Sequence, residues 1–333
     1  MRITIKQTNN QKLVELTKKS TFIDVASIWL EKIKKGIKDQ SYFKYANIIE
    51  KHLKTSSLAN ISISRLTSEK IATFLKEKEK SGKLSGQGGL APSTIKTIIY
   101  IIRATIQFAV STKLCKPLDL TEIKCKDKEK RQIVVLGKQD QIILEKYLLS
   151  RLNIRKLGII ICLYTGLRIG EVCGLMWENI DLKNKQISIV RTVQRIKNMD
   201  PSTANKTKLI CSTPKSQTSK RVLPLPDFLI PLLSTYKKES DYFLLSQKKS
   251  PMEPRVYEYF FVRLLKKCSI NHVKFHVLRH TFATRAIESG MDIKSLSELL
   301  GHASVDVTLS IYVHSSIELK RKSIENLVSF MNQ

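Results

Sequence analysis

Acidic residues are scarce in this chain, and their scarcity sets its charge. Lysine and arginine number 58 against 29 aspartate and glutamate residues, which leaves a formal net charge of +29 at pH 7. Such a basic surface attracts closely spaced phosphates, so nucleic acid is the leading class of partner. A lysine-rich coding bias is the alternative, and the abundance of isoleucine, lysine and asparagine also fits it. Charge alone leaves both interpretations open.

Long apolar runs are absent. No segment approaches the roughly 18 consecutive apolar residues that a membrane-crossing helix requires. The N-terminus lacks the apolar core of a signal peptide. The sequence therefore predicts a cytoplasmic protein with no membrane partner. Its 333 residues, 42% of them hydrophobic, are enough for two domains with separate apolar cores.

Cysteine is sparse, and no two cysteines form a C-x-x-C pair. Scattered cysteines of this kind are more often reduced core residues than disulfides or zinc ligands. The sequence also lacks a glycine-rich phosphate loop and an acidic cluster suited to Mg²⁺. We therefore expect neither a metal nor another cofactor. The six cysteines are Cys115, Cys125, Cys162, Cys173, Cys211 and Cys268.

Four short amphipathic patterns in residues 20–116 predict a small helical bundle. Thr21 can cap the first helix, with Asp24 at its third position. Residues 1–19 precede the bundle and are predicted to form a short basic arm or a single strand. The last helix opens at Ser93 and carries a continuous apolar stripe, formed by Ile95, Ile98, Ile99, Ile102, Ile106 and Ala109.

Residues 117–133 are predicted to be an exposed basic linker. Pro117 is expected to end the last helix of the bundle, and residues 124–131 are almost all charged. A run of charges is usually a solvated segment, yet a linker between two basic domains is well placed to touch a DNA backbone. Both interpretations stay open for the candidate DNA-binding residues Lys126, Lys128, Lys130 and Arg131.

Residues 134–333 are predicted to form a second, α+β domain with a tail from about residue 314. Residues 186–193 alternate like a strand, and residues 221–225 look like its edge partner because they contain a proline. After Pro226 the pattern is helical to the end, apart from turns. The predicted fold is mainly α with a small antiparallel sheet. Helical patterns come first, at 138–150, 154–165 and 168–176.

Four separated segments of this domain contain residues that make chemical sense only together. Taken singly, each has an ordinary explanation: a surface arginine, a solvated lysine or a half-buried tyrosine. His276 and Arg279 are three apart and so share one helix face, whereas His280 is expected to point elsewhere. In chain order the candidate residues are Arg168, Lys215, His276, Arg279, His302 and Tyr312.

This set resembles the catalytic residues of the tyrosine recombinase (phage integrase) family in their usual order. The most specific signatures are His-x-Leu-Arg-His-Thr-x-Ala-Thr and Leu-Gly-His-x-Ser-x-x-x-Thr-x-x-x-Tyr-x-His. The helical first domain is similar to the core-binding domain of the family, and Thr94-Ile95-Lys96 opens its last helix as in that domain. The resemblance covers most of the chain. It implies a C-shaped clamp of two domains around double-stranded DNA, with Lys96 a candidate DNA contact.

The resemblance also implies a reaction, in which Tyr312 attacks a DNA phosphate and forms a 3′-phosphotyrosine. Guanidinium groups suit the extra negative charge of the transition state, which points to Arg168 and Arg279. A phenol with a pKa of about 10 is a weak nucleophile and needs an acceptor, for which His276 is the candidate. Rejoining needs neither ATP nor a metal, because the phosphotyrosine keeps the bond energy.

Three further roles complete the expected site. Lys215 on its loop would protonate the leaving 5′-oxygen as the general acid. By family analogy, His302 would donate a hydrogen bond to the scissile phosphate. Glu171 would orient Arg168 and the nearby imidazoles.

Several alternatives stay open. A type IB topoisomerase shares this chemistry, and a catalytically silent DNA-binding regulator is a further candidate. Within recombinases, the composition resembles integrases of phages or conjugative elements of low-GC bacteria, and a Xer-type chromosome-dimer resolvase is the alternative. Only about 20 residues precede the helical bundle, so no separate arm-binding domain is expected.

Strand exchange between two duplexes needs four active sites, so we expect a homo-tetramer on paired DNA sites. An accessory directionality or DNA-bending protein is a further expected partner. The C-terminal tail carries an apolar stripe that could pack on its own domain or on a neighbouring protomer. The stripe consists of Ile317, Ile324, Leu327, Val328 and Met331.

Overall fold

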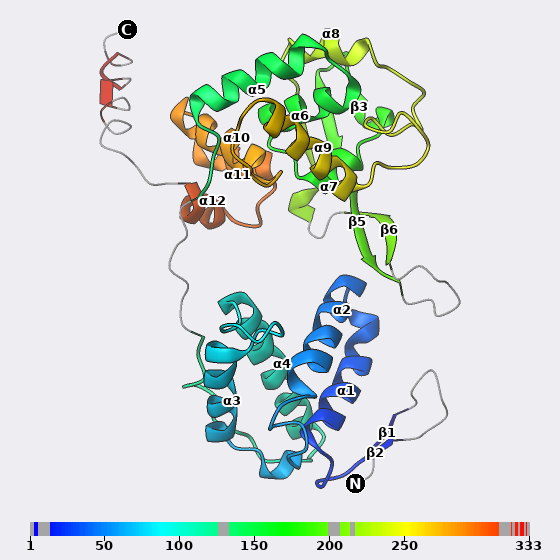
Figure 1. Ribbon diagram of the computed structural model, residues 1–333, viewed down its shortest axis with the longest axis vertical. Helices are drawn as coiled ribbons and strands as arrows, with labels where there is room; N and C mark the ends of the chain where they lie inside the picture. The colour runs from blue at the N-terminus through cyan, green and yellow to red at the C-terminus, as the bar shows by residue number, and fades with distance from the viewer. Residues whose placement is uncertain are drawn as a thin grey trace. The chain divides into compact units, whose positions relative to one another are not determined.

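The structure of the chain is a computed structural model with two compact units, Met1–Arg131 and Gln132–Gln333 (Figure 1). Each unit has its own apolar core. None of the helices in the described part of the chain combines the length and the hydropathy that a membrane crossing requires. The described residues are 3–5, 14–125, 133–198, 207–213 and 217–312, together with 321, 324, 325, 327–329 and 331.

In its described residues, the first unit is a bundle of four α-helices preceded by two short strands. Strand β1 pairs antiparallel with β2, so that Ile3 lies opposite Leu16. The predicted arm or single strand is therefore a two-stranded pair; its second strand is too short to show an alternation in the sequence. The elements are β1 (Ile3–Ile5), β2 (Val14–Leu16), α1 (Phe22–Ile33), α2 (Asp39–Ile48), a π-helical turn (Ile49–Leu53), α3 (Ser68–Ser81) and α4 (Pro92–Ser111), with 3-10 turns at Lys34–Gly36 and Ile63–Arg65.

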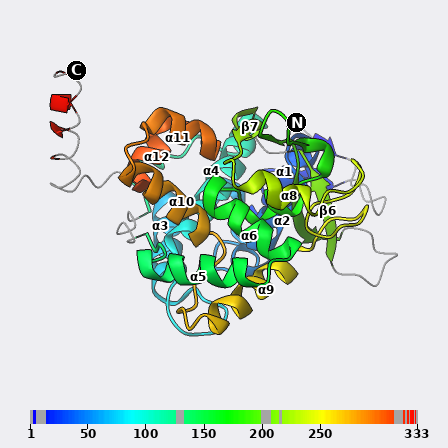
Figure 2. The ribbon, with the colours of Figure 1, turned by 90° about the horizontal axis from the view of Figure 1, so that it is seen from above.

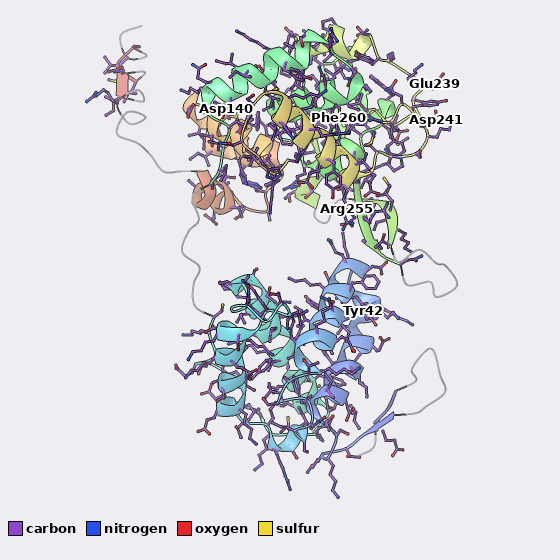
Figure 3. The ribbon with its side chains drawn as sticks, viewed as in Figure 1. Tyr42, Asp140, Glu239, Asp241, Arg255 and Phe260 are labelled. Carbon is purple, nitrogen blue, oxygen red and sulfur yellow. The ribbon has the colours of Figure 1, made fainter. Side chains whose placement is uncertain are left out.

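Local signals of the bundle act as the sequence predicts. The Thr21 hydroxyl accepts a hydrogen bond from the Asp24 N–H, and the Asp24 carboxylate accepts one from the Thr21 N–H, which confirms the capping box of α1. The apolar stripe of α4 is fully buried against the other helices. Tyr42 on α2, labelled in Figure 3, donates to Glu31 on α1 and joins the two helices.

Helix α4 ends at Ser111, six residues before the proline that was expected to end it. The Thr112 hydroxyl donates back to the Phe108 carbonyl at 2.8 Å, and Lys113 adopts a left-handed φ of 58°. The prediction that Pro117 ends the helix is therefore wrong. The chain turns because a side-chain hydrogen bond and one left-handed residue close the last helical turn.

The segment from Cys115 to Cys125, here called the strap, belongs to the first unit and packs on its helices. Ile123 is buried in the core of the bundle. Arg103 on α4 donates from Nη2 to the carbonyls of Leu120 and Ile123 at 3.0 and 2.9 Å. The first half of the predicted exposed linker is thus part of the bundle, because its apolar residues find a place in the core. The candidate DNA contacts Lys126, Lys128, Lys130 and Arg131 lie outside the described residues.

The second unit is mainly helical, as predicted, and its described residues form two small antiparallel sheets where one was expected. Helix α6 lies in its centre and packs against α5, α8 and α10 (Figure 2). The predicted helices at 138–150 and 154–165 are confirmed. The elements are α5 (Lys138–Ser150), α6 (Ile154–Thr165), α7 (Ile169–Cys173), β3 (Ile180–Asp181), β4 (Gln186–Ile189), β5 (Thr192–Lys197), β6 (Thr207–Ser212), β7 (Arg221–Pro224), α8 (Leu229–Ser234), α9 (Pro254–Lys267), α10 (Val277–Glu288), α11 (Ile293–Leu300) and α12 (Val305–Tyr312), with 3-10 turns at Trp177–Asn179 and Gln217–Ser219.

The predicted strand at residues 186–193 is divided between two sheets. Its first half, β4, pairs with β7 at the sheet edge, as expected, with Ile187 opposite Leu223. Its second half begins β5, which pairs with β6 in a separate two-stranded ribbon. Strand β6 gave no signal because neither of its faces is fully buried, so its side chains need no apolar alternation.

Two further predictions of secondary structure need correction. Helix α7 is shorter than the predicted 168–176, and Arg168 is its N-cap residue. Residues 235–253 form turns where a helical pattern was expected. Here Phe243, Leu244 and Leu245 are buried side by side, and the Leu244 N–H donates to the Leu175 carbonyl at 2.8 Å. Three buried apolar residues in succession suit a loop that crosses the core.

Candidate active site

Arg168 is placed by a glycine turn at the end of α6. Gly166 caps this helix in the left-handed conformation, at φ 66° and ψ 22°. A Cβ atom at Gly166 would lie 2.6 Å from Cδ1 of Phe282, so the position needs glycine for both its conformation and its space. Two residues later, the backbone N–H of Arg168 donates to Oε2 of Glu171 at 2.9 Å. The side chain of Arg168 stays 35% exposed.

Glu171 binds two guanidinium groups. Arg168 Nη1 donates to Glu171 Oε1 at 2.7 Å. Arg221 reaches the same carboxylate with Nη1 and Nη2, at 3.1 Å from Oε1 and 3.0 Å from Oε2. Burial by itself would raise the pKa of Glu171, but the hydrogen bonds and charges of Arg221 and Arg168 outweigh it and lower the pKa to about 2. Glu171 is therefore ionised. It contacts Arg168 directly, as its predicted role of orienting that arginine requires.

Arg221 is a site residue that the sequence prediction missed. It was treated only as the first residue of a strand. Yet it lies on the same side of β7 as the buried Leu223, two residues away, and its side chain is only 6% exposed. A charged residue in phase with a buried apolar one is a signal that the sequence contains. Arg221 Nε also donates to the Leu299 carbonyl at 2.6 Å.

Arg279 is the most deeply buried arginine of the site, with 2% of its surface exposed. Its Nη1 donates to the Gly166 carbonyl at 3.0 Å, and its Nη2 to the Leu300 carbonyl at 2.7 Å. These carbonyls belong to the C-terminal ends of α6 and α11, where partial negative charge collects. They are neutral groups, so they hold the guanidinium group without cancelling its charge.

His276 is the N-cap residue of α10, and its ring lies against the ring of His280, with centroids 4.6 Å apart. The expectation that His280 points elsewhere is wrong, because residues four apart share one side of a helix. His276 is exposed on its outer side. On its inner side partial desolvation, followed by the charges of His280 and Arg279, lowers the pKa of His276 to about 4.

His302 follows Gly301, which ends α11 in the left-handed conformation at φ 64°. A Cβ at Gly301 would lie 3.0 Å from the Thr218 carbonyl oxygen and 3.1 Å from Arg221 Nη1. The Nδ1 atom of His302 is 2.8 Å from the hydroxyl of Thr308, which is buried on α12. Partial burial, followed by the charges of Arg279 and Arg168, lowers the pKa of His302 to about 4.

The remaining predicted residues are described in part. Tyr312 is the last residue of α12, a helix that packs against α10 and α11, and its side chain lies outside the described residues. Lys215 also lies outside them, although the strand before it and the 3-10 turn after it are described. Lys96 is an exposed residue of α4 in the first unit. The structure therefore gathers Arg168, Glu171, His276, Arg279 and His302, and adds Arg221.

One flank of the site is formed by the β5–β6 ribbon and α9, both of which pack against α7. Arg195 on β5 donates from Nε to Glu253 Oε2 at 2.9 Å and from Nη1 to the Thr207 hydroxyl at 3.0 Å. Glu253 is the N-cap residue of α9, so this pair fastens both strands of the ribbon to the helix. Arg255 lies in the exposed first turn of α9, at the end near β5 (Figure 3).

The electrostatics of the described site favour an anion. Two guanidinium groups, from Arg168 and Arg221, bind the carboxylate of Glu171, and the guanidinium group of Arg279 lies near the same two histidines as Arg168. Main-chain carbonyls satisfy much of their hydrogen bonding and leave the positive charge in place. An anion with several acceptor oxygens, such as a phosphate, is the natural complement of this arrangement.

Family profiles agree with this arrangement. Residues 122–318 match the phage integrase family, and residues 21–78 match the SAM-like N-terminal domain of phage integrases. The first match alone covers more than half of the 333 residues. The chain therefore belongs to the phage integrase family.

Individual relatives include chromosomal and transposon enzymes. The chain is 26% identical over 337 residues to a XerC-like tyrosine recombinase of Caldanaerobacter subterraneus subsp. tengcongensis, covering 92% of this chain and 82% of the relative. It is 28% identical over 187 residues to the transposase of transposon Tn916 from Enterococcus faecalis, covering 51% of this chain and 44% of the relative.

Solved structures show the same fold. The integrase of transposon Tn1549, in complex with transposon right end DNA, has a TM-score of 0.70 at 22% identity, covering 91% of this chain and 99% of that one. A lambda integrase tetramer bound to a Holliday junction has a TM-score of 0.62 at 16% identity, covering 89% of this chain and 78% of that one.

Proposed function

We propose that this protein is a tyrosine-type site-specific DNA recombinase of a mobile element, which cleaves and rejoins DNA strands through a 3′-phosphotyrosine on Tyr312. The observation that carries the proposal is a cluster of three guanidinium groups, two of which bind the carboxylate of Glu171, with two imidazoles of low pKa beside it. Such a site binds a phosphate and leaves neutral bases next to it at pH 7.

In the proposed cleavage step, the Tyr312 oxygen forms a bond to the scissile phosphorus while the bond to the 5′-oxygen breaks. The tyrosine proton passes to His276, which is neutral at pH 7 because its pKa is low. The leaving 5′-oxygen takes a proton from Lys215. In the reverse direction the 5′-hydroxyl attacks the phosphotyrosine, so rejoining needs neither ATP nor a metal.

The arginines have different tasks in this mechanism. Arg168 keeps a third of its side chain exposed and is the one positioned to contact the nonbridging oxygens directly. Arg279 is buried and contributes its charge from behind, fixed by the carbonyls of two helix ends. His302, with Nδ1 engaged by Thr308, would donate to the phosphate from Nε2.

The substrate is double-stranded DNA, and the two units would close on it as a clamp. The relatives support this: the Tn1549 structure is a complex with transposon DNA, and the lambda structure is a tetramer on a Holliday junction. A homo-tetramer on paired sites follows from the chemistry, because one protomer supplies one tyrosine. An accessory directionality or DNA-bending protein and a cytoplasmic location remain part of the proposal.

A mobile-element integrase is preferred to a Xer-type resolvase. The similarity to the Tn916 transposase and the polar hairpin before Lys215 support this choice. Type IB topoisomerase activity is less well supported, because residues 122–318 match the phage integrase family. A silent regulator is less well supported, because the described residues that would bind the phosphate are all present.

Tyr312→Phe tests the proposal. The change removes the attacking oxygen and leaves the DNA-binding surface in place, so binding to a target site should persist while covalent adduct formation stops. The measurement is a denaturing gel of adducts on a nicked suicide DNA substrate, with gel-shift affinity as the control. A covalent adduct formed by the Phe variant would show that another residue is the nucleophile.

A further inference from the structure

Arg221 joins three parts of the site. It begins β7, two residues after the end of the 3-10 turn Gln217–Ser219, and its Nη1 donates to the Ser219 carbonyl at 3.2 Å. Its Nε donates to the carbonyl of Leu299 on α11. Its two Nη atoms engage both carboxylate oxygens of Glu171 on α7. The side chain is almost completely buried, so it is a connection within the protein rather than a DNA contact.

Each oxygen of Glu171 is shared between the two arginines. Oε1 accepts from Nη1 of Arg168 and Nη1 of Arg221. Oε2 accepts from the backbone N–H of Arg168 and from Nη2 of Arg221. The fork of Arg221 fixes the plane of the carboxylate, and the carboxylate in turn fixes both the backbone and the guanidinium group of Arg168.

Removing Arg221 would change Glu171 in two ways. The carboxylate would lose its stronger, two-point partner, and burial would then raise its pKa with only Arg168 to oppose it. Its plane would then be held by Arg168 alone, through the backbone N–H on Oε2 and the partly exposed guanidinium group on Oε1. Gly301 would also lose a close neighbour, because Arg221 Nη1 lies 3.1 Å from the point where a Cβ on Gly301 would stand.

We propose that Arg221 is a positioning residue for strand cleavage, which acts through Glu171 to aim Arg168 at the scissile phosphate. The inference rests on the proposed recombinase function. Lysine cannot replace it, since a single ammonium group cannot grip both oxygens of Glu171 and the Leu299 carbonyl at once.

The test compares two substrates that differ at the phosphate. One is a suicide DNA duplex with the natural phosphodiester, and the other has a methylphosphonate at the scissile position, which removes one nonbridging charge. Single-turnover cleavage is measured for the wild type, Arg221→Lys and Arg221→Met, together with DNA affinity and melting temperature. Arg285→Met is the matched control, because Arg285 on α10 also binds a carboxylate, with Nη1 donating to both oxygens of Glu288, while its other partners are Gln141 and the Leu136 carbonyl.

Both Arg221 variants should bind DNA within about threefold of the wild type and cleave the phosphodiester about 10- to 100-fold more slowly, the range found when a supporting residue of an active group is removed. On the methylphosphonate the loss should shrink at least several-fold, because less charge is left for Arg168 to neutralise. The Arg285 variant should melt earlier and keep the wild-type ratio of the two rates.

Three results would overturn the inference. The first is cleavage by the Arg221 variants at the wild-type rate. The second is a loss of cleavage rate by the same factor on both substrates. The third is a failure of both Arg221 variants to fold while the Arg285 variant folds, in which case Arg221 serves the fold alone. Absence of cleavage by the wild type would instead reject the proposed function, so the two failures are distinguishable.

Discussion

Single residues determine the charge of the site through the acceptors that they choose. Arg279 is held by the carbonyls of Gly166 and Leu300, which are neutral, whereas Arg168 and Arg221 share one carboxylate. Because one carboxylate serves both Arg168 and Arg221, this pair keeps a net positive charge that attracts a phosphate. Partial burial, and after it the positive surroundings, lower the pKa of His276 and His302 to about 4, since a further positive charge there is unfavourable.

The two histidines predict how stability depends on pH. Their pKa values are about 4 in the folded protein and about 6.5 in an unfolded chain, so the unfolded state binds more protons between these values. Stability should therefore fall as the pH drops from 6.5 toward 4. Urea unfolding of the free protein at several pH values measures this slope.

His276→Gln and His302→Gln serve as the controls for that slope, because each removes one of the shifted groups. Each variant should flatten the fall between pH 6.5 and 4. For the same reason, the limb of the kcat/KM profile due to His276 should lie below pH 6.5. The low pKa would be contradicted if kcat/KM of the wild type were half-maximal at pH 6.5 and this inflection were absent from the profile of His276→Gln.

At the scale of elements, two helices end at left-handed glycines that bring their terminal carbonyls to the arginines. Gly166 ends α6 and Gly301 ends α11. The carbonyls of Gly166 and Gly301 accept from Arg279 and Arg168, at 3.0 and 3.4 Å. Helix termination and arginine placement are therefore one structural feature, repeated at two helix ends.

Gly166→Ala tests this feature. The alanine would have to adopt the left-handed φ of residue 166, and its Cβ would lie 2.6 Å from Phe282 and 2.9 Å from Leu300. We expect a loss of about 2 to 4 kcal/mol in stability from conformational strain and overpacking together. Gly290→Ala is the matched control, with φ +96° and open space around the Cβ. Urea unfolding compares them, and equal losses would show that packing at Gly166 is unimportant.

The predictable elements are those whose local pattern matches their surroundings. Helices α5 and α6 and the Thr21 capping box follow from local sequence signals. Helix α5 buries Leu144 and Leu148, four residues apart, and α6 is a continuous apolar helix buried on most sides. The division of the predicted strand at 186–193 was missed because the apolar alternation continues without a break from β4 into β5, although the two strands belong to different sheets. The end of α4 was misplaced because a Thr112 hydrogen bond, rather than proline, stops the helix.

The site shows the same division. Family motifs indicated Arg168, Glu171, His276, Arg279 and His302, and the structure brings them together. Arg221 and the contact of His280 with His276 depend on tertiary packing between segments far apart in the sequence or on ring orientation. A motif specifies which residue types occur, whereas these contacts depend on how β7 and α11 meet.

At the scale of the whole molecule, the +29 charge predicts a strong response to salt. Log affinity for DNA should fall linearly with log salt concentration, because each phosphate contact releases counterions. Replacing Lys128 and Lys130 by Gln should make the slope shallower by up to about two. Fluorescence anisotropy on a target duplex measures it.

Lys237→Gln with Lys238→Gln is the matched control, since it removes the same charge from two exposed lysines of the second unit. If both pairs changed the slope equally, the effect would be one of net charge and the linker would have no special contact. If neither pair changed it, the linker would be a plain solvated tether.

The C-terminal tail is the second feature at this scale. Its described apolar residues, Ile324, Leu327, Val328 and Met331, are all exposed. We expect them to dock on a neighbouring protomer, because an exposed apolar stripe gains stability by burial. A chain that stops after Ser316 should bind one site normally and lose cooperative synapsis of paired sites on native gels. Unchanged synapsis would leave packing on its own domain as the interpretation of the stripe.

The strap also determines where this chain can be divided. A fragment that stops at residue 116, the boundary suggested by composition, would lose Ile123 and expose the core of the bundle that it covers. One such apolar side chain contributes roughly 1.5 to 3 kcal/mol by its burial. A fragment that extends through Cys125 keeps this cover and the two hydrogen bonds of Arg103. Limited proteolysis should accordingly spare the strap, and soluble expression of the bundle should require it.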